Sequence, residues 1–272
     1  MHGHHKLLAQ LKPWHAWPQD SRQEGDLFLR TVQAGHANIL AVLLQEGKYP
    51  SASNLGDLVT SAARKRHNEV LSTLLCYEAK IRSSFLAKRE FGFEDGTWEC
   101  ILLDALFSAC KNGDVNSAMM LLNHHPEKNA VNMVDATYNS APTAMHHACS
   151  GGSVEMVRLL IAAGAQYRIL DTNPLLFLAI TNGHFGNPYN TTFLTLVHGL
   201  IFSSSDLVKE LVEELAFDIN QEGPSGSAIT KAAAGGHSEI LQYLLNRPEC
   251  LLEGRLESAM SAAWYNLQFI SS

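Results

Sequence analysis

The chain has 272 residues, of which 46% are hydrophobic and 17% charged, with a formal net charge of −7. This length and apolar content allow a substantial core, and without about 20 uninterrupted apolar residues in a row we expect no membrane span. Residues 101–272 carry eight Lys and Arg against 16 Asp and Glu, which disfavours nucleic acid as a ligand. Five scattered cysteines, an odd number, fit a reducing, cytoplasmic location.

Residues 1–25 form a polar N-terminal segment in which residues 6–11 are expected to be a short helix. The rest is expected to be an arm or cap that covers the first structural unit, because exposed ends of stacked structures need covers. The alternative is an aromatic arm that binds a ligand. The residues that raise this alternative are Pro13, Trp14, Trp17 and Pro18.

A pattern of two short helices joined by a turn recurs between residues 26 and 270. In the clearest copy, residues 143–165, the small Ala148 and Cys149 precede the turn residue Gly152, and apolar residues then recur at helical spacing up to Gly164. One such pair cannot bury its own apolar face, so the copies must stack into a solenoid. The equivalent turn residues of the other copies are Gly35, Arg66, Gly113, Gly183 and Gly236.

This pattern resembles the ankyrin repeat family, which has a period of about 33 residues and units that start with Thr-Pro-Leu-His-x-Ala. The best match is Thr-Ala-Met-His-His-Ala at residues 143–148, where Ala144 replaces the proline. The resemblance covers roughly residues 26–270, with six degenerate repeats and a partial seventh. It implies an all-α, helix-turn-helix solenoid with short β-like finger loops and helical insertions.

Three insertions interrupt the repeats. Residues 79–104 are expected to continue a helix and then form an aromatic loop at residues 91–98. Residues 124–142 are expected to be an extended connection with a finger strand at residues 132–135. Residues 185–205 delay the next helix to residues 207–220, and their apolar composition favours an extra helix packed on the stack. The alternative is an element that docks a partner.

The C-terminal part repeats the first half of the pattern at residues 260–267, which predicts the first helix of a seventh unit. Its missing second helix leaves two interpretations, a degenerate cap or a fragment of a longer protein. The second is raised by large apolar residues that a natural end would expose. They are Trp264, Tyr265, Phe269 and Ile270.

The candidate catalytic and metal-binding groups each have a structural explanation. His146 and Cys149 have the spacing of metal ligands on a helix, but the resemblance assigns His146 a structural hydrogen bond and places Cys149 at a buried position. Histidines that follow turn residues indicate a repeated local hydrogen bond: His36, His67, His184 and His237. The N-terminal His2, His4 and His5 are read as part of a disordered terminus, and Glu213 and Glu214 as a solvated helix face. With none of the common phosphate-binding or zinc-protease motifs in the sequence, we expect no catalytic, cofactor-binding or metal-binding residue, and no enzyme.

In the ankyrin repeat family, partners bind the concave face made by the first helices and the finger loops. Carried onto this sequence, the resemblance predicts a partner-binding stripe made of Arg30, Gln33, Arg64, Lys65, Ser108, Lys111, Asn112, Tyr138, Asn139, His147, Ser150, Asp171, Thr181, Asn182 and Lys231. The stripe is basic at its N-terminal end, which suits an acidic or phosphorylated segment. The small residues further along suit an apolar or backbone-rich segment.

These observations predict a monomeric, non-catalytic module that binds another protein in the cytoplasm. The irregular repeats look similar to ankyrin proteins that intracellular bacteria deliver into host cells, which suggests an effector acting in the host cytoplasm. Two alternatives stay open. The chain is the ankyrin region of a larger multidomain enzyme, or it is itself a Cys–His enzyme built on an insertion.

Overall fold

The computed structural model describes residues 21–88, 97–127, 129–136, 142–166, 175–181, 204–223, 226–252 and 254–270. They form two compact units, Met1–Met133 and Val134–Ser272. Among the described residues, no helix is long and apolar enough to cross a membrane.

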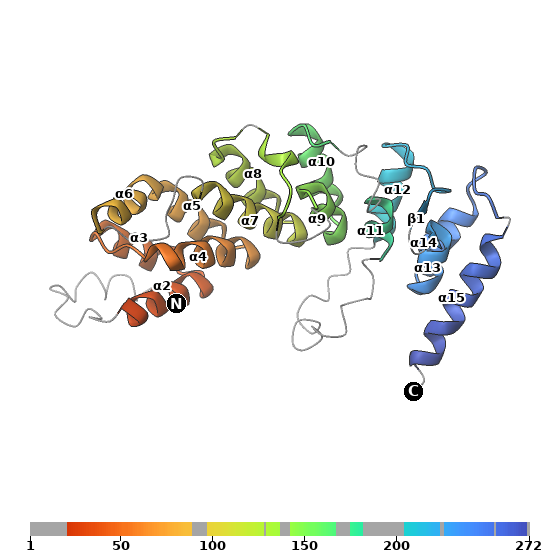
Figure 1. The fold of residues 1–272 in the computed structure, drawn as a ribbon, viewed down its shortest axis with the longest axis horizontal. Coiled ribbons are helices and arrows are strands. Elements are labelled where there is room, and N and C mark those ends of the chain that lie inside the picture. The colour runs from red at the N-terminus through yellow and green to blue at the C-terminus, as the bar shows by residue number, and fades with distance from the viewer. Residues whose placement is uncertain are drawn as a thin grey trace. The chain divides into compact units, whose positions relative to one another are not determined.

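The first unit consists of helix pairs stacked in two layers (Figure 1). Its helices are α2 (Ser21–Gln33), α3 (Ala37–Gln45), α4 (Ala52–Arg64), α5 (Asn68–Cys76), α6 (Glu78–Lys88), α7 (Thr97–Asn112), α8 (Val115–His124) and the 3₁₀ helix η1 (Ala130–Asn132). The first helices of the pairs pack on one another in the order α2, α4 and α7, and we call them the inner helices. The second helices, α3, α5 and α8, pack in the same order and form the outer layer, with α6 against α5.

The second unit repeats this arrangement. Its elements are α9 (Ala144–Gly151), α10 (Val154–Ala162), α11 (Leu175–Thr181), α12 (Ser204–Glu213), β1 (Glu222–Gly223), β2 (Gly226–Ser227), α13 (Ala228–Ala234), α14 (Ser238–Leu245) and α15 (Arg255–Ile270). The inner helices pack in the order α9, α11, α13 and α15, and the outer helices in the order α10, α12 and α14. Strands β1 and β2 pair antiparallel as a two-stranded hairpin, so the predicted all-α solenoid with β-like finger loops is confirmed.

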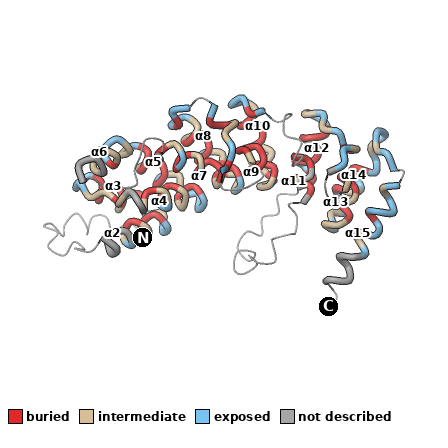
Figure 2. Tube along the Cα trace, viewed as in Figure 1, coloured by how far each residue is buried: buried red, intermediate tan, exposed pale blue. Residues whose placement is uncertain are grey.

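The inner helices are held by one apolar face each, as α4 illustrates. Leu55, Leu58, Val59 and Ala62 recur at spacings of three and four residues and are fully buried, which is the pattern of a helix with one face against a core. Small residues close to the turns let neighbouring helices approach, and Cys149 is buried there like an alanine. Figure 2 shows burial concentrated between the two layers of helices in each unit.

The turns between paired helices confirm the repeat register. The turn residues lie in the left-handed region, with φ of 73° at Gly35, 65° at Gly113, 74° at Gly152 and 69° at Gly236. Arg66 takes the same conformation with φ of 57°, although a side chain disfavours it. The N–H of the residue after most of these turns bonds to a carbonyl five residues earlier, as in His67 to Ala62, which is the Schellman pattern that ends a helix. Gly183 lies outside the described residues.

The first predicted insertion is shorter than residues 79–104. Helix α6 covers its start, as expected, with Ile81 fully buried. Helix α7 begins at Thr97, so the prediction that Trp98 lies in a loop is wrong. Trp98, Leu102 and Leu106 are buried at a spacing of four residues, which extends the apolar face of the inner helix backwards. Residues 91–96 lie outside the described residues.

The connection at residues 124–142 contains the expected finger as an isolated bridge. Val134 pairs antiparallel with Thr143, and the N–H of Asp135 donates to the carbonyl of Pro142 at 2.7 Å. The insertion at residues 185–205 lies outside the described residues except for its last two, which belong to α12.

The helix predicted at residues 207–220 is α12, which ends at Glu213. The N–H of Phe217 bonds to the carbonyl of Leu211, six residues earlier, and Ala216 is left-handed with φ of 52°. These residues therefore form a turn, and the prediction that the helix continues to residue 220 is wrong. Leu215, Phe217 and Ile219 recur every second residue, which is not the spacing of a helical face.

The two ends of the chain differ in how far the structure describes them. Helix α2 begins at Ser21, before the predicted boundary at residue 26, and residues 1–20 lie outside the described part, so the N-terminal cap stays a prediction. Helix α15 packs on α13 as the expected inner helix of a seventh unit. Met260 and Trp264 on α15 are exposed.

Candidate partner-binding surface

The exposed surface of the inner helices in the first unit carries most of the predicted stripe that the structure describes. Gln33, Arg64 and Lys111 each lie two residues before a turn, on α2, α4 and α7, and all three are exposed. Because these helices pack side by side, the three side chains occupy equivalent places on successive helices. Ser108 is half-buried one helical turn before Lys111.

Arg30 on α2 belongs to the same surface. Its guanidinium lies 2.9 Å from the carboxylate of Asp26, one turn earlier, and the two side chains are 78% and 54% exposed. An ion pair this exposed contributes little to stability, so Arg30 can exchange Asp26 for a partner's carboxylate at small cost.

A ladder of hydrogen bonds between repeats uses two residues that the sequence assigned to partner binding. Lys65 Nζ donates to the carbonyl of Gln33 at 3.3 Å, and Asn112 Nδ2 donates to the carbonyl of Arg64 at 2.7 Å. In both cases the donor is the residue just before a turn. The acceptor belongs to the preceding repeat and lies two residues before the turn of that repeat. His67 Nε2 lies 3.2 Å from the same Gln33 carbonyl, and Arg66 donates to the carbonyl of Asn112. Lys65 and Asn112 therefore hold adjacent repeats in register.

The histidines after the turns share the repeated local hydrogen bond that their positions predicted, and they make it through the backbone. His36, His67 and His237 begin α3, α5 and α14 without a side-chain cap. In the described residues it is their backbone N–H groups that repeat one hydrogen bond. His184 lies outside the described residues.

The same inner helices carry an acidic row that the sequence reasoning missed. Asp26, Asp57 and Asp104 each lie nine residues before a turn, and all are exposed. They stand seven residues before Gln33, Arg64 and Lys111, and two helical turns return to the same helix face. Counting back seven residues from Gln33, Arg64 and Lys111 would have found them.

In the second unit, His147 points into a structural contact. Its Nε2 lies 3.1 Å from a carboxylate oxygen of Asp135 in the finger, and their side chains are 12% and 7% exposed. The predicted contact residue therefore braces the finger against α9 and offers little surface.

The neighbouring His146 is the structural histidine that the resemblance implied. Its Nδ1 accepts a hydrogen bond from the backbone N–H of Thr143 at 3.1 Å and lies 2.9 Å from the Thr143 hydroxyl. Burial, and secondarily the neighbouring His147, lower the pKa of His146, so the ring stays neutral and its Nδ1 remains an acceptor.

The remaining predicted residues of the second unit contribute little that the structure describes. Ser150 and Lys231 are half-buried, and burial lowers the pKa of Lys231. Thr181 ends α11, and its side chain is not described. Four residues lie outside the described residues: Tyr138, Asn139, Asp171 and Asn182.

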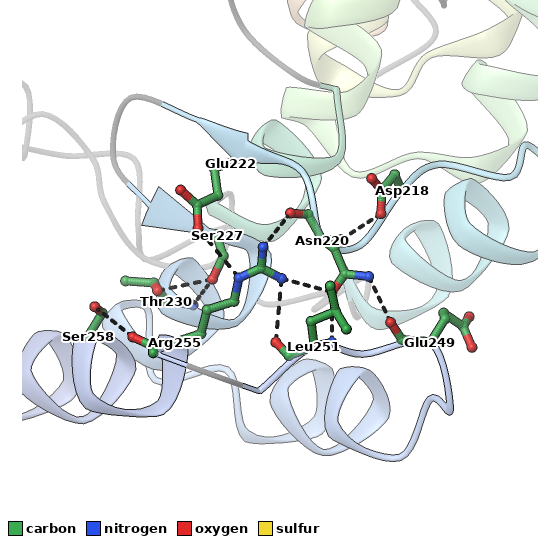
Figure 3. Close-up of polar contacts among 10 residues, drawn as sticks. Asp218, Asn220, Glu222, Ser227, Thr230, Glu249, Leu251, Arg255 and Ser258 are labelled. Carbon is green, nitrogen blue, oxygen red and sulfur yellow. Dashed lines mark hydrogen bonds and ion pairs between the residues drawn. The ribbon is translucent and has the colours of Figure 1, made fainter.

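The β1–β2 finger is fixed by a polar cluster that the sequence did not reveal (Figure 3). Asn220 Oδ1 accepts from the N–H of Leu251 and from Arg255, each at 2.8 Å, and Asn220 Nδ2 donates to the carbonyl of Glu249 at 2.7 Å. Arg255 also donates to the carbonyl of Asn220 at 2.9 Å and lies 3.4 Å from the carboxylate of Glu222 in β1. The cluster ties the finger to the start of α15.

The buried cysteines have the properties of core residues. Burial raises the pKa of both Cys110 and Cys149 to about 12, whereas a nucleophilic cysteine needs a lowered pKa and access to solvent. Across the described ranges, no group of three or more His, Cys, Asp or Glu side chains is arranged to hold a metal ion.

Stacked helix pairs, left-handed turns and finger loops define an ankyrin-type solenoid. Residues 106–187 match the family model for ankyrin repeats, in three copies. The ankyrin repeat and KH domain-containing protein mask-1 of Caenorhabditis elegans is 24% identical over 272 aligned residues, which cover 90% of this chain and 10% of the relative. Residues 106–187 thus match ankyrin repeats, as the sequence resemblance indicated, and the chain spans about a tenth of the length of that relative.

Proposed function

We propose that this chain binds a segment of a partner protein through the exposed surface of the inner helices α2, α4 and α7. Ankyrin repeats are generally non-catalytic units of protein–protein interaction. The observation that carries the proposal is the exposure of Arg64 and Lys111 at equivalent places on adjacent helices. The ladder donors Lys65 and Asn112 hold these helices in register, so the two cations are presented at a fixed spacing.

Charge complementarity on such a surface contributes to association rate and specificity more than to raw affinity. Hence we expect binding to weaken as salt rises, because exposed charges are screened over about 10 Å at 0.1 M ionic strength.

The test is a double charge reversal, Arg64→Glu with Lys111→Glu, which spares the ladder donors. A matched control, Lys80→Glu with Lys209→Glu, changes two exposed lysines outside the inner helices by the same net charge. Partners captured by the wild-type chain are identified, and their dissociation constants are measured with all three proteins. We expect a loss of roughly tenfold or more for the inner-helix variant and near-wild-type binding for the control. Equal affinities for the two variants would refute the proposed surface.

Further parts of the proposal concern the oligomeric state, the cellular compartment and the lack of catalytic activity. We propose a monomeric, non-enzymatic chain in a reducing, cytoplasmic compartment, supported by five free cysteines. Delivery into a host cell as a bacterial effector is supported by the irregular repeats, and a translocation assay with a fused reporter tests it. Turnover of any substrate that is lost on alkylation of Cys149 would overturn the non-enzymatic part.

A second candidate role is favoured by the coverage of the mask-1 relative. Since the match spans 10% of that protein, these repeats are also suited to serve as the binding region of a larger multidomain protein. Size analysis of the native gene product distinguishes the two: a product much longer than this chain supports the larger protein, and one of this length contradicts it.

A further inference from the structure

The inner helices of the first unit carry two rows of opposite charge. The acidic row is Asp26, Asp57 and Asp104, near the start or middle of α2, α4 and α7. The basic row is Arg30, Arg64 and Lys111, toward the ends of the same helices. On α4 and α7 the two charges lie seven residues apart, so the rows are separated by about 10 Å along the helix axes.

The rows run across the stack at a regular interval. Packed helices lie about 8–10 Å apart, and α2, α4 and α7 are consecutive in their layer. Lys65 bonds to Gln33, and Asn112 bonds to Arg64 at the equivalent positions. Helix α7 therefore lies against α4 in the same register as α4 lies against α2. A ligand lying across α4 and α7 therefore meets a negative and a positive position on each helix, about 10 Å apart. On α2 the equivalent of Arg64 is the neutral Gln33, and Arg30 is paired with Asp26 until a ligand replaces one of them.

An extended strand matches this interval poorly. With a rise of about 3.3 Å per residue, the residue 10 Å further along is the third, and its side chain points to the opposite face of the strand. An α-helix rises about 1.5 Å per residue, so 10 Å corresponds to about seven residues, which return to the same helix face. A helix is also about 10–12 Å wide with its side chains, which matches the separation of the two rows.

We propose that the partner segment is an α-helix with charges of opposite sign on its two flanks, repeated about every seven residues. Its acidic flank faces Arg64 and Lys111, and its basic flank faces Asp57 and its equivalents. This inference rests on the proposed function and specifies the partner of the same surface. A nucleic acid or a multiply phosphorylated peptide would place negative charge against the aspartates, which disfavours both.

The test uses three synthetic helical peptides of equal length and fluorescence anisotropy with the full 272-residue chain at low salt. The first peptide carries Glu on one flank and Lys on the other at every seventh position. The second carries Glu on both flanks, and the third is the first with a central proline, which breaks the helix. We expect the first peptide to bind at least about tenfold more tightly than either of the others.

Two protein variants then locate the contact. Asp57→Lys should reverse the preference, so that the all-Glu peptide binds more tightly than the two-signed one. The matched control, Glu69→Lys, makes the same charge change at an exposed site on the outer helix α5 and should leave the order unchanged. A tighter all-Glu peptide on the wild-type chain, equal binding of the proline peptide, or an effect of Glu69→Lys equal to that of Asp57→Lys would each overturn the proposal.

Failure of this inference is separable from failure of the proposed function. If no peptide binds, or the preferences are absent, while Arg64→Glu with Lys111→Glu still weakens a captured partner, the two-signed helix is wrong and the binding surface stands. If that double variant changes neither peptide nor partner binding, both proposals fail. Circular dichroism of each variant establishes that the helices are intact.

Discussion

Replacing Asn220 by alanine should loosen the finger and the start of α15 together. The change removes three hydrogen bonds of 2.7–2.8 Å, to the Leu251 N–H, to Arg255 and to the carbonyl of Glu249. A neutral hydrogen bond contributes about 0.5–1.5 kcal/mol, and one to a charged group somewhat more. Because two of the three bonds, to Leu251 and to Glu249, are exposed to solvent, water recovers part of this, and we expect a net loss of about 2 kcal/mol.

Two measurements check this prediction. Urea unfolding gives the change in the free energy of unfolding, and hydrogen exchange reports whether the Leu251 amide loses protection. Asn220→Asp is the matched control, since it keeps the acceptor for Leu251 and adds a charge against Arg255, while it replaces the donor to the Glu249 carbonyl by a second acceptor. Its cost should therefore stay below that of Asn220→Ala. If Asn220→Ala lies within about 0.5 kcal/mol of wild type and Leu251 exchange is unchanged, the cluster does not stabilise the finger.

Three further predictions concern backbone turns and buried thiols. Ala216→Gly should stabilise the chain by about 1 kcal/mol in thermal unfolding, because Ala216 has a φ of 52° that costs a side chain about 1–2 kcal/mol. Gly35→Ala should lower the thermal stability more than Gly164→Ala does. Both residues have positive φ, but a new Cβ at Gly35 meets the imidazole of His67 in the next repeat at 2.9 Å, whereas a new Cβ at Gly164 meets nothing within 4 Å. Equal losses for the two variants would contradict this explanation. Because burial raises the pKa of Cys110 and Cys149 to about 12, the unfolded state loses these protons first, and stability should fall by about 1 kcal/mol per pH unit per thiol above about pH 9. Cys110→Ala with Cys149→Ala should flatten that dependence.

The repeat register was predictable because each turn has a local cause. A left-handed residue after a run of small ones marks the turn, and even Arg66 could be placed since its neighbours Ala62 and Ala63 fit the pattern. The prediction failed at positions where tertiary packing decides the conformation and the neighbouring sequence does not. Trp98 follows an aromatic, glycine-containing segment in the sequence, yet the buried face of α7 extends back to include it. Ala216 gives no local sign of a left-handed turn.

The candidate surface was predictable only as a set of positions. Counting from each turn placed Gln33, Arg64 and Lys111 on one exposed surface, as the structure shows. It did not show that Lys65 and Asn112 bond to the preceding repeat, because such contacts depend on the distance between helices that are far apart in sequence. The cluster around Asn220 and Arg255 has the same character: its members come from three segments, and none forms a motif alone.

The two units keep their repeats in register by different means, and this difference explains where a charged binding surface can form. In the first unit the residue before each later turn, Lys65 or Asn112, reaches the backbone of the preceding repeat. The side chain one position earlier is then left to solvent and can carry a charge for a partner. In the second unit the residues before the turns at Gly152 and Gly236 are glycines, Gly151 and Gly235, which have no side chain to donate. There the contacts between repeats come from the outer helices, where Arg158 donates to Glu210, and from the Asn220 cluster, so polar side chains are engaged in internal contacts. A partner that reads charge should therefore depend on the inner helices of the first unit, and variants of the second unit should alter stability before they alter binding.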